Sequence, residues 1–251
     1  NLSEIQKQLD TGEMVQGFDI PEARLSATID VDQEKRLGRN VIGVLSAEQT
    51  AAHPNPAVVV GAHIDGLGLK GGAGSLATEE EKGQIHYGAD DNASGVAAML
   101  EIAEYLADQK QQGKLKMERD VVFAGWSGEE IGLLGSSHFV RKLAKDYLGQ
   151  ENAPLGLLLS SYLNMDMIGR IVDGGVTLHG VPSAENFEQW LTPYMDESPL
   201  SFSMPSQVSR RSDHAPFYFE GNMPVLFAIC DPLHSDYHTV RDEAWKINRV
   251  G

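Results

Sequence analysis

The positions of hydrophobic residues along the chain predict most of its secondary structure. Largely apolar runs of strand length, typical of strands that are covered on both faces, occur four times. They lie at 57–62, 120–124, 155–166 and 223–230. Weaker signals predict a short strand at 176–178 and half-exposed strands at 24–31 and 40–45.

Helical spacing of apolar residues follows several of these strands. The predicted helices lie at 93–106, 131–143 and 184–191. Strands and helices in alternation predict an α/β fold of three layers, α/β/α, with a mostly parallel, mixed and twisted central sheet. The glycine-rich segment 66–88 has no periodicity and is predicted to be a loop at the rim of a site. Ligands in such folds bind beyond the carboxyl ends of the strands.

Composition and charge narrow the class of protein. A chain of 251 residues, 41% of them hydrophobic, predicts one domain over 1–251. The formal charge of −16 repels phosphate backbones and anionic lipids, so we expect neither nucleic acid nor membrane as a partner. Cys230, the single cysteine, lies in an apolar run and is expected to be a buried, unreactive thiol. Because the chain starts at Asn1, we expect a processed or trimmed fragment.

Five short segments carry residue types that bind metal ions, and most of them follow a predicted strand closely. They are 62–65, 88–95, 127–130, 163–166 and 236–238. Together they supply imidazoles and carboxylates but no thiol. This ligand set suits two zinc-like ions that share a bridging carboxylate better than it suits a structural zinc site.

Two metal ions about 3.5 to 4 Å apart can hold one hydroxide between them and polarise a carbonyl group. The adjacent Glu129 and Glu130 can divide the remaining work, one binding metal and the other taking the proton of water. Asp65 can orient the His63 imidazole. Each motif alone has a structural alternative, such as a helix cap or first-turn charge. A purely structural explanation is harder to give for Asp166, since a carboxylate rarely ends an apolar strand without a partner.

The motifs and their order resemble the co-catalytic zinc exopeptidases, which include bacterial secreted aminopeptidases and glutamate carboxypeptidase. The resemblance extends from about Asn40 to Asp242. Its motifs are His-x-Asp at 63–65, Gly-Ala-Asp-Asp-Asn-Ala-Ser-Gly at 88–95, Ser-Gly-Glu-Glu at 127–130, Asn-x-Asp-Met at 164–167, Ser-Asp-His-Ala-Pro-Phe at 212–217 and Tyr-His-Thr at 237–239. It implies a zinc-exopeptidase-like fold and two zinc ions per chain.

The same resemblance implies a ligand set. His63 and Asp166 would hold one zinc ion, Glu130 and His238 the other, and Asp91 would bridge the two. His234 remains a rival to His238, because residues 234–238 read His-x-Asp-x-His.

Four further positions take supporting roles by resemblance. Glu129 would be the general base and later the general acid, and Tyr237 would stabilise the oxyanion. Asp65 would support His63, and Asp242 is expected near the second histidine. The remaining histidines receive no ligand role, and His214 alone among them is expected at the rim or behind the ligands. The others are His53, His86, His138 and His179.

The resemblance implies an aminopeptidase that removes N-terminal residues from peptides through a metal-bridging hydroxide. A carboxypeptidase on the same centre is the first alternative, with Arg210 and Arg211 as candidates for binding a substrate carboxylate. A one-zinc glutaminyl cyclase-like acyltransferase and a non-catalytic interaction domain are further alternatives. The resemblance also implies a secreted or periplasmic protein, and a catalytic domain separated from an upstream protease-associated domain.

Overall fold

The computed structural model describes residues 2–12, 17, 24, 26–30, 35–48, 55–69, 72–171 and 175–248. Two units are distinguished, 1–37 and 38–251. Among the described residues of the first unit there is one helix, α1 (Leu2–Leu9). Residues 24 and 26–30 have no regular structure, so the strand predicted at 24–31 is wrong for them, and Ile29 is 81% exposed. An alternating pattern makes a strand only where another strand and a buried face receive it.

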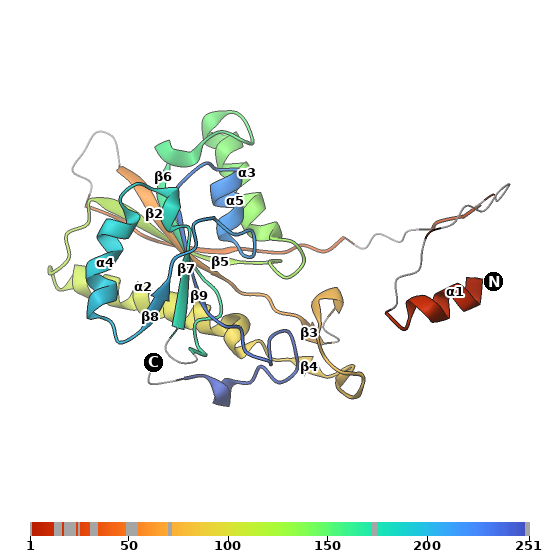
Figure 1. The fold of residues 1–251 in the computed structure, drawn as a ribbon. Helices are drawn as coiled ribbons and strands as arrows, with labels where there is room; N and C mark the ends of the chain where they lie inside the picture. Colours follow the sequence, from red (N-terminus) through yellow and green to blue (C-terminus); the bar gives the residue numbers. More distant parts are fainter. Residues whose placement is uncertain are drawn as a thin grey trace. The chain divides into compact units, whose positions relative to one another are not determined.

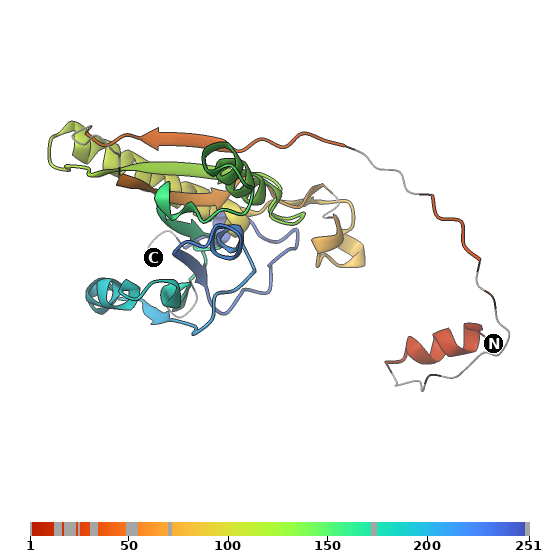
Figure 2. The same cartoon turned by 90° about the horizontal axis from the view of Figure 1, so that it is seen from above.

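The second unit is built on a seven-stranded mixed sheet (Figure 1). In spatial order the strands are β1 (Val41–Leu45), β5 (Arg119–Trp126), β2 (Asn55–His63), β6 (Leu159–Met165), β9 (Val225–Cys230), β7 (Gly175–His179) and β8 (Ser201–Ser203). The central four, β5, β2, β6 and β9, are parallel, whereas β1 and β7 run antiparallel to their central neighbours. Figure 2 shows β1 at the edge, beside β5 and then β2.

Helices cover both faces of this sheet. The α-helices of the unit are α2 (Gly95–Gln111), α3 (Leu134–Leu148), α4 (Phe187–Glu197) and α5 (His214–Phe219). Neighbouring residues of β2 point to opposite sides: Val59 packs in the core with residues of α3 and α5, and Val60 packs with Met99 of α2. Figure 1 shows the same layers. The α/β fold of three layers with a mixed central sheet is therefore confirmed.

Short elements escaped prediction. The segment predicted as a loop at 66–88 contains a small hairpin, β3 (Gly68–Leu69) with β4 (Ile85–His86), and two 3₁₀ turns at Gly72–Gly74 and Glu79–Glu81. Two-residue strands are too short for any period to be detected. Helix α5, with six residues, and strand β8, with three, were also not predicted because they are too short to show a clear period. Further 3₁₀ turns lie at Leu155–Leu157, Val181–Ser183 and Ala244–Lys246.

Two expectations from composition concern the thiol of Cys230 and membrane-spanning helices. Cys230 is buried, and burial raises the pKa of its thiol to about 12, as expected of an unreactive thiol. In the part of the chain that the structure describes, no helix combines the length and the apolar character that a bilayer crossing requires.

The carboxyl ends of the parallel strands lie at one edge of the sheet. His63 is the last residue of β2, and Asp166 follows directly after β6. Glu129 and Glu130 come shortly after β5 ends at Trp126, and His238 lies in the segment that follows β9. These five predicted site residues therefore follow four adjacent strands and can meet at this edge.

Candidate metal centre

Two groups of potential metal ligands lie at this edge, and they share one carboxylate. The first group is His63, Asp91 and Asp166, all buried. His63 Nε2 lies 3.1 Å from Asp91 Oδ1 and 3.4 Å from Asp166 Oδ1. The three atoms converge on one point from two strand ends and the turn before α2, which is the geometry a bound cation requires.

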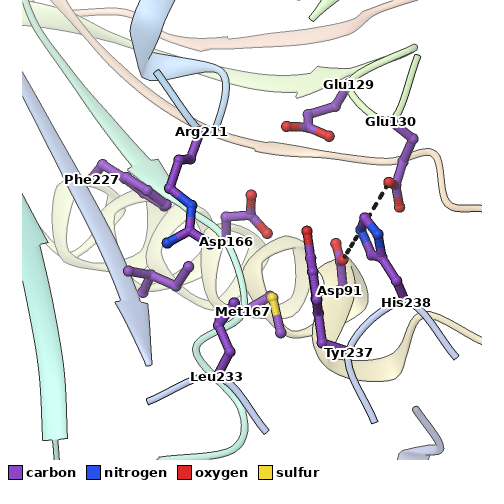
Figure 3. A pocket seen from close by; sticks show the side chains of 11 residues that line it. Asp91, Glu129, Glu130, Asp166, Met167, Arg211, Phe227, Leu233, Tyr237 and His238 are labelled. Carbon is purple, nitrogen blue, oxygen red and sulfur yellow. Dashed lines mark ion pairs between the residues drawn. The ribbon is translucent and has the colours of Figure 1, made fainter. Parts of the chain in front are cut away.

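The second group is Asp91, Glu130 and His238. His238 Nε2 lies 3.2 Å from Asp91 Oδ2 and 3.3 Å from Glu130 Oε2 (Figure 3). Asp91 thus offers one oxygen to each group. His238 Nδ1 is bonded to the carbonyl oxygen of Gly74 at 2.8 Å, which orients the ring.

Asp91 sits in an irregular turn at 89–94 whose backbone is held from the far end of the chain. Asp91 and Asn92 depart from helical geometry, and the peptide bond between them is cis. The Asp242 carboxylate accepts hydrogen bonds from the backbone amides of Asp90 and Asp91 at 2.9 to 3.0 Å. Asp242 therefore positions Asp91, the candidate ligand that both groups share, a role that its expected place near the second histidine did not specify.

Asp65 has a wider role than orienting an imidazole. Its backbone carbonyl oxygen is 3.1 Å from His63 Nδ1. Its carboxylate accepts hydrogen bonds from the backbone amides of Glu129, at 3.1 Å, and Glu130, at 3.3 Å. One residue thus fixes His63, a candidate ligand, and both adjacent glutamates. Sequence reasoning missed the second contact because backbone amides leave no motif.

Asp166 shows how the residues fit a metal ion. Its Oδ2 accepts a 2.7 Å hydrogen bond from Ser212 Oγ. Its Oδ1 is buried, faces His63 and has no hydrogen-bond partner. A buried, unpartnered carboxylate oxygen is costly unless a cation completes it. The donor set, carboxylate oxygens and imidazole nitrogens, is one that zinc accepts.

Glu129 and Tyr237 line the cavity of about 150 Å³ that opens beside both groups (Figure 3). Burial raises the pKa of Glu129 to about 9; the charge of His63 opposes this rise, and Asp166 supports it. The Tyr237 ring stacks on His238 with centroids 3.7 Å apart. Burial also raises the pKa of the Tyr237 phenol, followed by the charge of Asp91, so the hydroxyl stays protonated.

The opposite wall of the cavity is apolar, apart from one cation. Figure 3 shows Arg211 on the same side as the apolar residues and away from Glu130 and His238. The apolar wall consists of Met167, Phe227, Ile229 and Leu233.

His234, the rival ligand, belongs to a different cluster. Its Nε2 lies 3.1 Å from Asp90 Oδ2, and Arg170 approaches its Nδ1 at 3.1 Å. Because arginine can only donate, Nδ1 accepts and Nε2–H donates to Asp90. His234 belongs to neither ligand group, whereas His238 belongs to the second.

The other histidines lie outside both ligand groups where they are described. His214 is buried against Phe227, and burial lowers its pKa to about 4. His86 is bonded to Ser75, and His179 stacks on Phe227. His138 is exposed on α3, and residue 53 lies outside the described residues.

The carboxylates of the two ligand groups shift the pKa values of both histidines. Burial lowers the pKa of His238, but contacts with Asp91 and Glu130 outweigh burial and raise it to about 10. The pKa of His63 is raised well above its ordinary value by Asp166 and Asp91, again against burial. Burial raises the pKa of Asp91, yet the two histidines lower it to about 2. Protonated imidazoles therefore supply the positive charge that metal ions would supply.

Zinc binding is expected to release these two protons. Both imidazoles have raised pKa values, so below those values a metal ion must displace a proton from each, and zinc affinity falls as the pH falls. Calorimetric titration at pH 7 in two buffers with different ionisation heats measures the number released. These two protons and a third from Glu129, whose raised pKa falls when cations bind beside it, make about three per chain. Binding with no release would contradict this electrostatic description.

Comparison with known proteins agrees with the geometry. An aminopeptidase of Pseudomonas aeruginosa (strain UCBPP-PA14) is 31% identical over 210 residues, which cover 80% of this chain and 33% of the relative. Leupeptin-inactivating enzyme 1 of Streptomyces exfoliatus is 31% identical over 74% of this chain and 36% of its own length. The chain thus spans about a third of the length of these curated relatives.

Solved structures share the fold. A zinc aminopeptidase from Bacillus subtilis matches with a TM-score of 0.60 and 27% identity over 83% of this chain and 45% of its own. A glutaminyl cyclase of Porphyromonas gingivalis matches with a TM-score of 0.59 over 83% of this chain and 71% of its own, but at 19% identity it shows the fold alone.

Fold, site and relatives together point to a family of metal-dependent peptidases. The profile of Peptidase family M28 matches residues 40–250, and the chain belongs to this family. The resemblance to co-catalytic zinc exopeptidases is therefore confirmed.

Proposed function

We propose that this chain is the catalytic part of a zinc-dependent aminopeptidase that holds two zinc ions. His63 and Asp166 would bind one ion, Glu130 and His238 the other, and Asp91 would bridge them. The observation that carries this proposal is that the two ligand groups share Asp91 while Glu129 lines the cavity beside them. The aminopeptidase relatives support the reaction class.

The chain's own residues divide the work of hydrolysis. Bound zinc would polarise the substrate carbonyl and lower the pKa of water. Nearby cations lower the pKa of a carboxyl group, so with zinc bound Glu129 is a carboxylate able to accept the proton of the attacking water. Protonated Glu129 then donates to the leaving amine. The neutral Tyr237 hydroxyl donates a hydrogen bond to the developing oxyanion.

The cavity's charges favour a substrate with a free amino terminus. Glu129 lines it and is the lining carboxylate that is assigned to neither metal ion, so it can attract an ammonium group. The apolar wall of the cavity can receive an apolar side chain beside that ammonium.

Dipeptides blocked at one end test this function. We expect hydrolysis of dipeptides with a free amino group and an amidated carboxyl end, and none of N-acetylated dipeptides. A chelator should abolish the activity, and added zinc should restore it. Zinc content near zero after gentle purification, with no turnover, would favour the non-catalytic interaction domain.

Carboxypeptidase activity remains the second candidate because of Arg211. This arginine lines the cavity and has no ion pair or hydrogen bond among the described residues, whereas Arg210 stacks on Phe219 at 3.6 Å. A free guanidinium beside the ligands is suited to a substrate carboxylate. Cleavage of N-blocked dipeptides that weakens in Arg211→Gln, but not in the control Arg210→Gln, would support this candidate and contradict the first.

Two expectations from the resemblance complete the proposal. We propose peptides as the substrates and a secreted or periplasmic location. Immunodetection of the whole protein in culture medium, periplasmic and cytosolic fractions tests the location, and recovery from the cytosol alone would contradict it.

A further inference from the structure

A chain of hydrogen bonds leads from the core of the unit to Asp166. Trp126 Nε1 donates to the Tyr162 hydroxyl at 2.7 Å, and that hydroxyl donates to Asn164 Oδ1 at 2.5 Å. Asn164 Nδ2 donates to Ser212 Oγ at 2.8 Å, and Ser212 donates to Asp166 Oδ2 at 2.7 Å. Side chains from β5 and β6 and from the segment before α5 are thus connected in one series.

The direction of every bond in this series is determined by its two ends. The indole N–H of Trp126 can only donate, and an ionised carboxylate can only accept. Each hydroxyl between them has a single proton, so each must donate toward Asp166. Trp126, Asn164 and Ser212 are 0% exposed and Tyr162 is 1% exposed, so bulk water does not compete along the series. Charge-assisted and mutually polarising hydrogen bonds of this kind are stronger than isolated ones.

Packing keeps the remote end of the series in place. A Cβ atom added at Gly61 would lie 2.8 Å from both Trp126 Nε1 and the Tyr162 hydroxyl, so the backbone of β2 packs directly against their hydrogen bond. The Tyr162 ring also lies 4.2 Å from the Phe217 ring, between centroids. Neither aromatic side chain has room to turn away.

We propose that Tyr162 and Trp126 are positioning residues for the metal ion held by His63 and Asp166. The series binds Oδ2 of Asp166 from behind and leaves Oδ1, which has no hydrogen-bond partner, facing His63 Nε2 at 3.4 Å. Asp166 is thereby held as a ligand through one oxygen. This inference rests on the proposed function for its metal ions. It implies that Tyr162 and Trp126 affect the binding of the ion held by His63 and Asp166 and not the binding of the other ion.

The test measures stepwise zinc affinity in Tyr162→Phe. The matched control is Tyr218→Phe, which removes the same atom from a ring packed against the same core. Loss of a partner behind a metal ligand typically weakens affinity about 10- to 100-fold. We expect Tyr162→Phe to weaken one of the two zinc ions about 10-fold, toward the lower end of that range because the change is remote, and to leave the second unchanged. Tyr218→Phe should change neither.

A double-mutant cycle separates a connected series from general loosening of the core. Ser212→Ala should weaken the same ion by about 10- to 100-fold. Once Ser212 is gone, adding Tyr162→Phe should weaken zinc no further, because the series is already cut. If Tyr162→Phe does not fold, judged by circular dichroism, Trp126→Phe tests the series from its first donor.

Additive effects of Ser212→Ala and Tyr162→Phe, or equal weakening of both ions, would overturn the inference. Unchanged affinity in Tyr162→Phe, with two ions bound to the wild-type protein, would overturn the inference and leave the proposed function standing. A wild-type protein that binds no zinc would overturn both.

Discussion

Glu129→Gln is expected to lower the turnover of aminoacyl amides by at least about 10²- to 10⁴-fold, with both zinc ions still bound. Glutamine has nearly the same shape but cannot accept the proton of water. Glu129 belongs to neither ligand group and lines the cavity beside them, so its loss affects proton transfer and not metal binding. Steady-state kinetics on a leucine amide, with zinc content measured on the same sample, checks this result.

The control for this variant is Glu101→Gln on the exposed side of α2, which should behave as the wild-type protein. The pH profile gives a second readout, because the limb that reports ionisation of the base should disappear in Glu129→Gln. Full activity in Glu129→Gln would show that another group takes the proton.

Asp91→Asn is expected to abolish high-affinity binding of both zinc ions, and the activity with them. The asparagine side chain is neutral and keeps only one oxygen, whereas Asp91 offers one charged oxygen to each ligand group. By contrast, His63→Ala and His238→Ala each remove a ligand from one group only. Metal analysis after equilibrium dialysis should therefore find about zero ions in Asp91→Asn and about one ion in each histidine variant.

Asp108→Asn, an exposed change on α2, controls for the loss of one negative charge. Circular dichroism of the dialysed proteins controls for folding. If Asp91→Asn kept one ion with unchanged affinity, the carboxylate would belong to a single group and the shared-ligand arrangement would be wrong.

The meeting of the candidate ligands at one edge could be predicted because strand ends are visible in sequence. His63 ends a continuous apolar run and Asp166 follows another, and parallel strands deliver such residues to one edge. The choice between His234 and His238 could not be made from local spacing alone, since both lie two residues from Asp236. It depends on which ring faces Asp91 and which faces Asp90, and that follows from the loop after β9.

The groups behind the ligands were the least predictable part of the site. Ser212 reaches Asp166 across 46 residues of chain, and Asp65 bonds backbone amides that any sequence could supply. Contacts of this kind depend on tertiary placement and leave no periodic pattern. The strand prediction failed at residues 24 and 26–30 for a related reason, because a local alternation does not specify a neighbouring strand.

The carboxylate of Asp242 has a consequence for when the candidate metal centre can form during synthesis. It secures the turn that carries Asp91, about 150 residues earlier in the chain. A nascent polypeptide in which residues 238–242 have not yet been synthesised lacks both this support and His238. The polypeptide must therefore be synthesised at least through Asp242 before both ligand groups are complete and the turn of Asp91 is supported.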